Sequence, residues 1–203
     1  MASSKTEICN IALSHLGSAK DVANVETEAS QEAGACRRFY DMALKATLRD
    51  FPWSFATKIA DMQLVEEDPN DEWAYSYRYP SDCLRMRRIL SGNRNDTNDT
   101  REPYKISRDA SGLLIFSDKE NAEIEYTKYE TDPLAYPEDF VVALSYRLAA
   151  FIAPRVTAGD KFKLGAAAMQ NYLFEISRAE STSLNEQQAD IHPDSEFIRV
   201  RNG

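Results

Sequence analysis

Apolar residues in the first 60 positions recur at the spacing of amphipathic helices. A first short helix is predicted to begin with a capping box at Ser4 and to stop at Gly17. Its apolar series at i, i+3, i+4 and i+7 is Cys9, Ala12, Leu13 and Leu16. A second, longer helix is expected to begin near Thr27 or Glu28 and to end at Pro52.

Between residues 61 and 130 the pattern changes to the period of a strand. The clearest strand places four aromatic side chains on one face, namely Trp73, Tyr75, Tyr77 and Tyr79. Further strand-like runs, separated by polar linkers, are "DCLRMRRIL", "PYKIS", "GLLIF" and "AEIEYTKYE". These runs predict an antiparallel sheet of about five strands.

Helical periodicity returns in "YPEDFVVALSYRLAAFIAP", where Pro137 suits the first turn of a helix. This helix is apolar around most of its circumference, which predicts a central position. A last helix follows "RVTAGD", and the sequence then turns polar around "STSLNEQQ". The remaining residues have no helical period and are expected to form an extended tail.

The predicted fold class is therefore α+β. An antiparallel helical bundle is expected from residues 1–60 and 131–185, with an antiparallel β-sheet domain inserted at residues 61–130. Residues 186–203 form the extended C-terminal tail in this scheme.

The stretch "RDFPWSFATK" places large aromatic residues around the proline that ends the second helix. Pro52 cannot continue a helix, so the chain has to turn there. Phe51, Trp53 and Phe55 are well suited to fasten this turn into a core. We therefore predict that these four residues form a structural anchor between the helices and the sheet.

Composition narrows the possible partners. The chain has 203 residues, a net charge of -9 and a pI near 4.8, which disfavours tight binding to nucleic acid phosphates. Its three cysteines include no CxxC pair and suit a reducing cytoplasm. Neither a signal peptide nor a membrane-spanning run is expected.

The sequence lacks the common motifs of catalytic and cofactor-binding sites. It contains no phosphate-binding loop, dinucleotide fingerprint, HExxH or GxSxG, so no catalytic residue and no cofactor are expected. His15 and His192 stand far apart, and the acidic runs "EEDPNDE" and "NRNDTNDT" lack the features of a calcium loop, so no metal site is expected. A hydrolase that uses a pair of carboxylates remains the alternative, because such a pair has no sequence signature.

Two clusters of basic residues are open to two interpretations each. In "RMRR", Arg85 and Arg87 share one strand face, which indicates a solvated strand with acidic neighbours rather than an ion pair between subunits. The end of the chain, "DSEFIRVRNG", is either a frayed terminus or a strand that awaits a partner. Its β-branched residues favour a partner interface formed by Phe197, Ile198, Arg199, Val200 and Arg201.

Four segments, in this order, resemble the head-to-tail adaptor family of short-tailed bacteriophages, also called tail tubular protein A. They are "EICNIALSHLGS", "CRRFYDMALKATLRDFPWSFA", "WAYSYRYPSDCLRM" and "YRLAAFIAPRVTAGDKFKLGAAAMQNYLFEISRAE". The segments cover most of the chain, and the tail beyond residue 184 is the part least covered.

The resemblance implies a structural subunit without catalytic residues. It implies a homo-oligomeric ring, usually dodecameric, that sits beneath the portal protein, extends the DNA channel and docks the tail nozzle protein. Double-stranded DNA would pass through without specific binding, which suits the acidic composition. The protein would be assembled in the host cytoplasm and would reside in the virion. The residue pattern of the tail, rather than the resemblance, predicts that it docks on the portal or on a neighbouring subunit.

Overall fold

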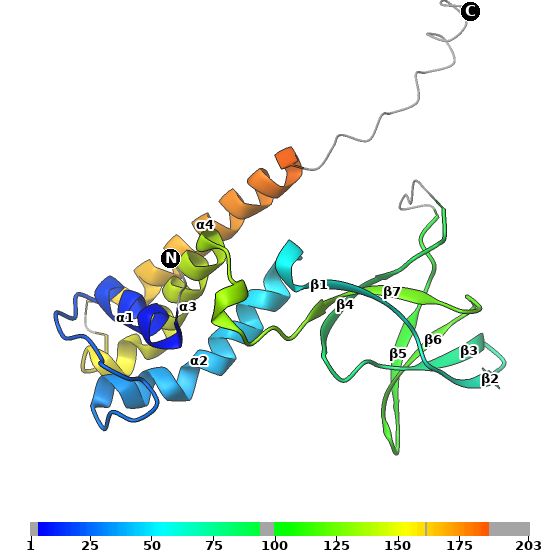
Figure 1. The fold of residues 1–203 in the computed structure, drawn as a ribbon, viewed down its shortest axis with the longest axis horizontal. Helices are drawn as coiled ribbons and strands as arrows, with labels where there is room; N and C mark the ends of the chain where they lie inside the picture. Colours follow the sequence, from blue (N-terminus) through cyan, green and yellow to red (C-terminus); the bar gives the residue numbers. More distant parts are fainter. Residues whose placement is uncertain (1–3, 94–99, 161, 187–203) are drawn as a thin grey trace, which may run out of the picture.

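Helices and strands occupy separate parts of the molecule (Figure 1). The structure, a computed structural model, describes residues 4–93, 100–160 and 162–186. Within these residues it contains four α-helices and two antiparallel sheets, so the α+β class is confirmed. We call the four helices the helical region and the seven strands the β region.

Two helices precede the strands. Helix α1 (Lys5–His15) begins with the predicted capping box of Ser4 and Glu7, and Gly17 follows its end with a φ of 74°. Helix α2 (Gln31–Asp50) begins later than predicted, because the Ser30 side chain caps it by accepting a hydrogen bond from the amide of Ala33.

Two helices follow the strands. Helix α3 (Glu138–Val156) contacts each of the other three, as its all-round apolar sequence predicted. Helix α4 (Leu164–Glu186) packs on α3 after a tight turn in which Gly159 has a φ of 97°. A Cβ at Gly165 would lie 3.0 Å from that of Ala153, so glycine permits this close approach.

The β region is built from two sheets rather than the single sheet of about five strands that the sequence predicted. One sheet has the order β1-β7-β4 and the other β2-β3-β6-β5. The strands are β1 (Thr57–Asp61), β2 (Leu64–Asn70), β3 (Trp73–Arg78), β4 (Cys83–Ile89), β5 (Lys105–Asp109), β6 (Gly112–Ser117) and β7 (Glu123–Lys128). The sheet therefore begins at Thr57, before the predicted boundary at residue 61.

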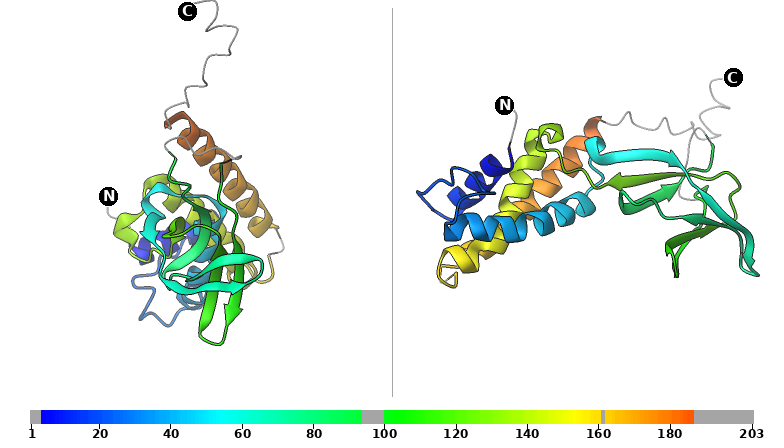
Figure 2. Two further views of the ribbon diagram at one scale, coloured as in Figure 1. Left: turned by 90° about the vertical axis from the view of Figure 1, so that its right-hand side faces the viewer. Right: turned by 60° about the horizontal axis from the view of Figure 1, so that its bottom comes forward.

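Each region has its own core. The helical core takes residues from all four helices and from the segment between α2 and β1. The smaller β core joins the two sheets, and its buried residues are Met62, Tyr77, Met86, Ile89, Ile115, Ala122, Ile124 and Tyr126. The two regions lie end to end along the long axis of the molecule (Figure 2).

Candidate assembly surfaces

The predicted aromatic anchor lies where the helical region meets the β region. Trp53 is buried, packs edge-to-face on Phe51 and Phe140, and its Nε1 donates a hydrogen bond of 3.0 Å to the carbonyl oxygen of Thr47. Phe55 is half-buried and also contacts Phe140. Pro52 is exposed, so the anchor consists of the three aromatic side chains.

Two arginines of β4 bind the end of α2. The Arg87 guanidinium donates to the carbonyl of Phe51 at 2.9 Å and to the hydroxyl of Thr127 at 2.8 Å, and Arg85 donates to the carbonyl of Arg49 at 2.6 Å. Carbonyls at the end of a helix lack partners within it, and the helix dipole favours cations there. The arginines therefore join the two regions.

The sequence interpretation of "RMRR" was incomplete for Arg85 and Arg87: Arg85 is exposed and Arg87 lies near Glu125 and Asp50, but both donate hydrogen bonds to backbone carbonyls at the end of α2. It was right for Arg88, whose Nη2 lies 2.7 Å from a carboxylate oxygen of Glu125 on the neighbouring strand. Sequence reasoning missed the interaction with α2 because it depends on where the chain returns after 36 residues.

A polar cluster ties α4 to the rest of the helical region. The Tyr172 hydroxyl of α4 donates to Asp50 at 2.7 Å and accepts a hydrogen bond of 2.7 Å from Arg147 of α3. Arg147 also forms an ion pair with Asp50 at the end of α2. Burial raises the pKa of Tyr172, so its hydroxyl remains a donor at neutral pH. This cluster fixes the orientation of α4.

The outward face of α4 carries no charged residue between Leu164 and Asn171, and none in its exposed positions up to Ser177. Its largest members are Leu173 and Phe174, whose exposed fractions are 59% and 66%. The other exposed members are Ala166, Ala167, Gln170, Asn171 and Ser177. We call this set of seven residues the α4 face. The sequence analysis did not single it out, although its lack of charge could have been read from the helical period.

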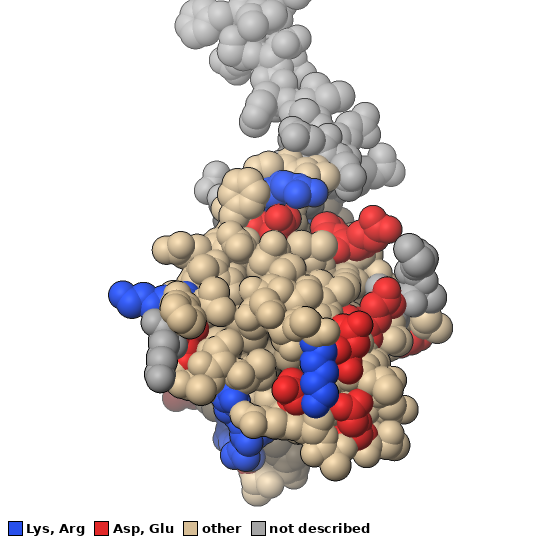
Figure 3. All heavy atoms as spheres, turned by 90° about the vertical axis from the view of Figure 1, so that its left-hand side faces the viewer, with Lys and Arg blue, Asp and Glu red and all other residues tan. Residues whose placement is uncertain are grey.

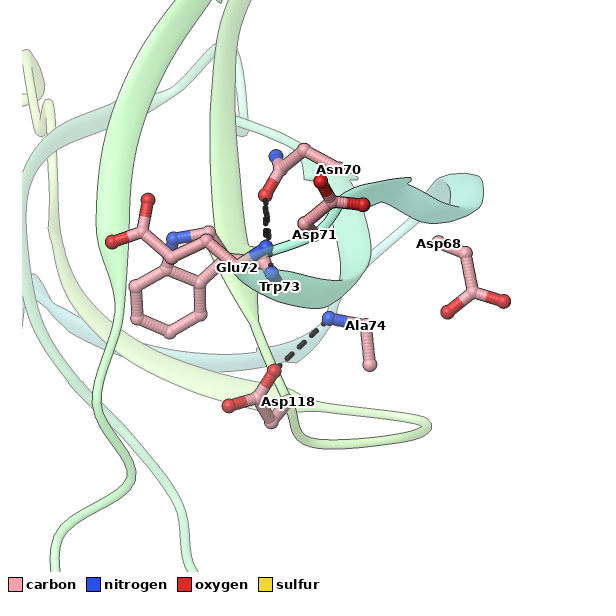
Figure 4. A pocket seen from close by; sticks show the side chains of 7 residues that line it. All are labelled: Asp68, Asn70, Asp71, Glu72, Trp73, Ala74 and Asp118. Carbon is pink, nitrogen blue, oxygen red and sulfur yellow. Dashed lines mark hydrogen bonds between the residues drawn. The ribbon is translucent and has the colours of Figure 1, made fainter.

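The acidic turn between β2 and β3 encloses an open hollow of about 450 Å³ (Figure 4). The side-chain oxygen of Asn70 accepts hydrogen bonds from the amides of Glu72 and Trp73, and Asp118 accepts one from Ala74. These oxygens stabilise the turn itself and do not converge on one point. Among the described residues, no group of His, Cys, Asp and Glu has the geometry of a metal site.

His15 is half-buried against α3. Its ring stacks on that of Tyr146 with centroids 3.9 Å apart, and its Nε2 lies 3.0 Å from the hydroxyl oxygen of Ser145. Burial lowers the pKa of His15 below its ordinary value. Ser145 is itself buried and donates to the carbonyl of Val142, so this pair is part of the packing between α1 and α3.

The predicted interface in the tail, Phe197 to Arg201, lies outside the described residues. Within the part of the chain that is described, no helix is long and apolar enough to cross a membrane. No family model matches the chain, and no curated protein matches it either.

Proposed function

We propose that the chain is a structural subunit of a phage head-to-tail adaptor. Copies of it form a ring, usually dodecameric in the family that the sequence resembles, beneath the portal protein. The four helices form an antiparallel bundle that makes the body of the ring, and the β region makes contacts with the next component of the tail. The ring extends the DNA channel without binding the DNA specifically, and it resides in the virion.

The main support for this proposal is that the four segments on which the resemblance rests contact one another. Arg85 of the third segment binds the carbonyl of Arg49 in the second. Tyr172 of the fourth segment binds Asp50 in the second. In addition, His15 of the first segment stacks on the first residue of the fourth, Tyr146. Segments far apart in sequence thus form one connected framework.

A framework of this kind suits a connector. A subunit that docks a portal on one side and a tail component on the other has to transmit force without bending between its two parts. The aromatic anchor and the arginines of β4 fasten the helical region to the β region with packing and with hydrogen bonds to charged groups. This arrangement favours a mechanical role.

The test mixes the purified chain with purified portal rings from the genome that encodes it. Electron microscopy of negatively stained particles should show an additional ring of density at one end of the portal. Particles that remain bare portals at micromolar concentrations of the chain would contradict the proposal. Release of soluble fragments from purified peptidoglycan would favour the hydrolase alternative instead.

A further inference from the structure

Two of the three cysteines lie in the helical core, on different helices. Cys9 belongs to α1 and Cys36 to α2, and the exposed fraction of each is 0%. Both are members of the same cluster of buried residues. The third cysteine, Cys83, lies in β4 and packs against the β core instead. We call Cys9 and Cys36 the thiol pair.

The contacts between α1 and α2 place the two thiols opposite each other. The Nζ of Lys5 lies 5.0 Å from the centre of the Tyr40 ring. Cys9 follows Lys5 by four residues and Cys36 precedes Tyr40 by four, so each cysteine shares a helix face with one partner of this contact. One turn further along these faces, the Cys9 thiol donates a hydrogen bond to the sulfur of Cys36.

The segment between α1 and α2 holds the two helices together around the thiol pair. The amide of Val25 donates to the hydroxyl of Thr6 at 3.2 Å, and Arg37 donates to the carbonyl of Val25 at 2.7 Å. Lys5 forms an ion pair of 2.5 Å with Glu26. Figure 3 views the end of the helical region where this segment lies, and closely packed side chains form its surface. The thiol pair is therefore held in register and shielded from solvent.

The two thiols differ in how readily they ionise. The hydrogen bond from Cys9 lowers the pKa of Cys36, and the same hydrogen bond raises the pKa of Cys9. The thiolate, rather than the thiol, is the form that attacks a disulfide. Cys36 is thus suited to react first, with Cys9 beside it to react second.

We infer that Cys9 and Cys36 form a redox-sensitive cross-link between α1 and α2, open in the cytoplasm and closed after the assembled particle leaves it. The inference rests on the proposed function, because a virion passes from a reducing to an oxidising environment. It adds to that function a device that strengthens the subunit outside the cell.

The oxidant is a small disulfide such as oxidised glutathione. The Cys36 thiolate attacks one of its sulfurs, so the bond between the two glutathione sulfurs breaks, a mixed disulfide forms on Cys36 and one glutathione leaves. The Cys9 thiolate then attacks the sulfur of Cys36 and releases the second glutathione. Each departing glutathione takes up a proton given up by a cysteine. The two cysteines lose two electrons in all, and the oxidant gains them.

Helix α1 controls access to the thiol pair. It has 11 residues and packs mainly on α3, so local opening of this short helix exposes both thiols to the oxidant. The closed cross-link joins α1 to α2, with which α1 otherwise packs only slightly. Because it also restricts the unfolded chain, closure should raise the melting temperature by about 5–10 °C.

Oxidation of the purified, fully reduced chain with oxidised glutathione tests the cross-link. Two of the three thiols should disappear from a titration in denaturant. Trypsin cleaves after Lys5, Lys20 and Arg37, so a non-reducing digest should contain the peptide of residues 6–20 linked to that of residues 21–37. The melting temperature should rise as stated above, and dithiothreitol should reverse the rise.

Three alanine variants identify the residues responsible. Cys9→Ala and Cys36→Ala should each lose the linked peptides and the rise in melting temperature on oxidation. Each variant is compared with its own reduced form, so a stability change caused by alanine itself does not enter the comparison. Cys83→Ala is the matched control and should keep both the link and the rise, because Cys83 lies outside the helical core.

Three results with the purified chain overturn the inference. They are peptides 6–20 and 21–37 that stay unlinked, glutathione that stays bound to Cys36, and a link that forms without raising the melting temperature. A cross-link that disappears in Cys83→Ala would do the same, because it would assign the disulfide to a different pair.

A second measurement separates the inference from the proposed function. Virions dissolved in denaturant with an alkylating reagent should yield the linked peptides, whereas infected cells treated alike should yield Cys9 and Cys36 in alkylated form. Virions that contain the chain with both cysteines alkylated overturn the inference and leave the proposed function standing. Virions that lack the chain overturn the adaptor role, even if the purified chain forms the cross-link.

Discussion

Trp53 combines burial, ring packing and a hydrogen bond in one side chain. Replacing it by alanine removes a large aromatic from a closed site, so Trp53→Ala should lower the free energy of unfolding by about 3–5 kcal/mol. Urea denaturation measures this difference. Phe162→Ala is the control, since Phe162 is an aromatic residue that is exposed, and it should change stability by less than about 0.5 kcal/mol. An unchanged midpoint for Trp53→Ala would mean that the anchor is not needed.

Arg87 donates hydrogen bonds to carbonyl oxygens at the end of α2 and to the hydroxyl of Thr127. Arg87→Met keeps much of the aliphatic volume and removes the donors, which leaves the hydroxyl of Thr127 without its partner and the carbonyl of Phe51 with only the amide of Trp53. A loss of about 1–3 kcal/mol is expected from such unsatisfied groups. Arg108→Met, at an exposed position of β5, is the control. Equal denaturation midpoints for the two variants would contradict the proposed capping of α2.

His15 makes stability depend on pH. Its pKa in the folded chain lies below the ordinary value of 6.5, so the unfolded chain takes up this proton first as the pH falls. The contribution of His15 to stability is therefore present above pH 6.5 and is lost as the pH falls through the lowered pKa. His15→Gln should flatten the decrease in stability between about pH 7 and about pH 5. Equal slopes for the wild type and His15→Gln would exclude this role of His15.

At the scale of elements, side-chain caps fix where the helices of the helical region begin. Ser4 and Ser30 start α1 and α2, and the carboxylate of Asp160 accepts hydrogen bonds from the amides of Leu164 and Gly165 at the start of α4. These contacts set where α4 leaves α3, and hence where the α4 face lies.

We expect the C-terminal tail to contribute to attachment to the portal and not to the stability of the fold. Deletion of residues 191–203 should leave the circular dichroism spectrum and the melting temperature unchanged, because among the described residues the last one in the helical core is Ala179. We expect the deletion to weaken attachment to portal rings by about tenfold or more, since it removes Phe197 and two arginines from the proposed interface. Saturation of portal rings at the wild-type concentration would show that the tail is passive. A chain with Arg199→Ser and Arg201→Ser tests the charge contribution separately.

At the scale of the whole molecule, stability is expected to come from the two cores and from the joint between them. The side-chain oxygens of Asn70 and of Asp118, beside the turn between β2 and β3, accept hydrogen bonds from the backbone instead of converging on a cation. Treatment with EDTA should therefore leave the melting temperature unchanged. A decrease that added calcium or magnesium reverses would show that metal binding contributes to folding.

Local patterns of the sequence determined much of the secondary structure. The capping box of α1, the central position of α3 and the alternation of Trp73, Tyr75 and Tyr77 in β3 follow from residues close together in the chain. These features depend on helical and strand periods, which a single sequence displays directly. The aromatic residues after α2 were likewise recognisable because a proline ends the helix beside them.

Only the tertiary structure decided how these elements combine. Strand β7 pairs with β1 and β4 and so divides the strands into two sheets, a pairing that joins distant parts of the chain. The same holds for Arg85 and Arg87, which reach α2, and for the α4 face, whose exposure depends on which side of α4 meets α3. Periodicity indicates which face of an element is apolar, but long-range packing decides which of those faces is covered and which remains exposed.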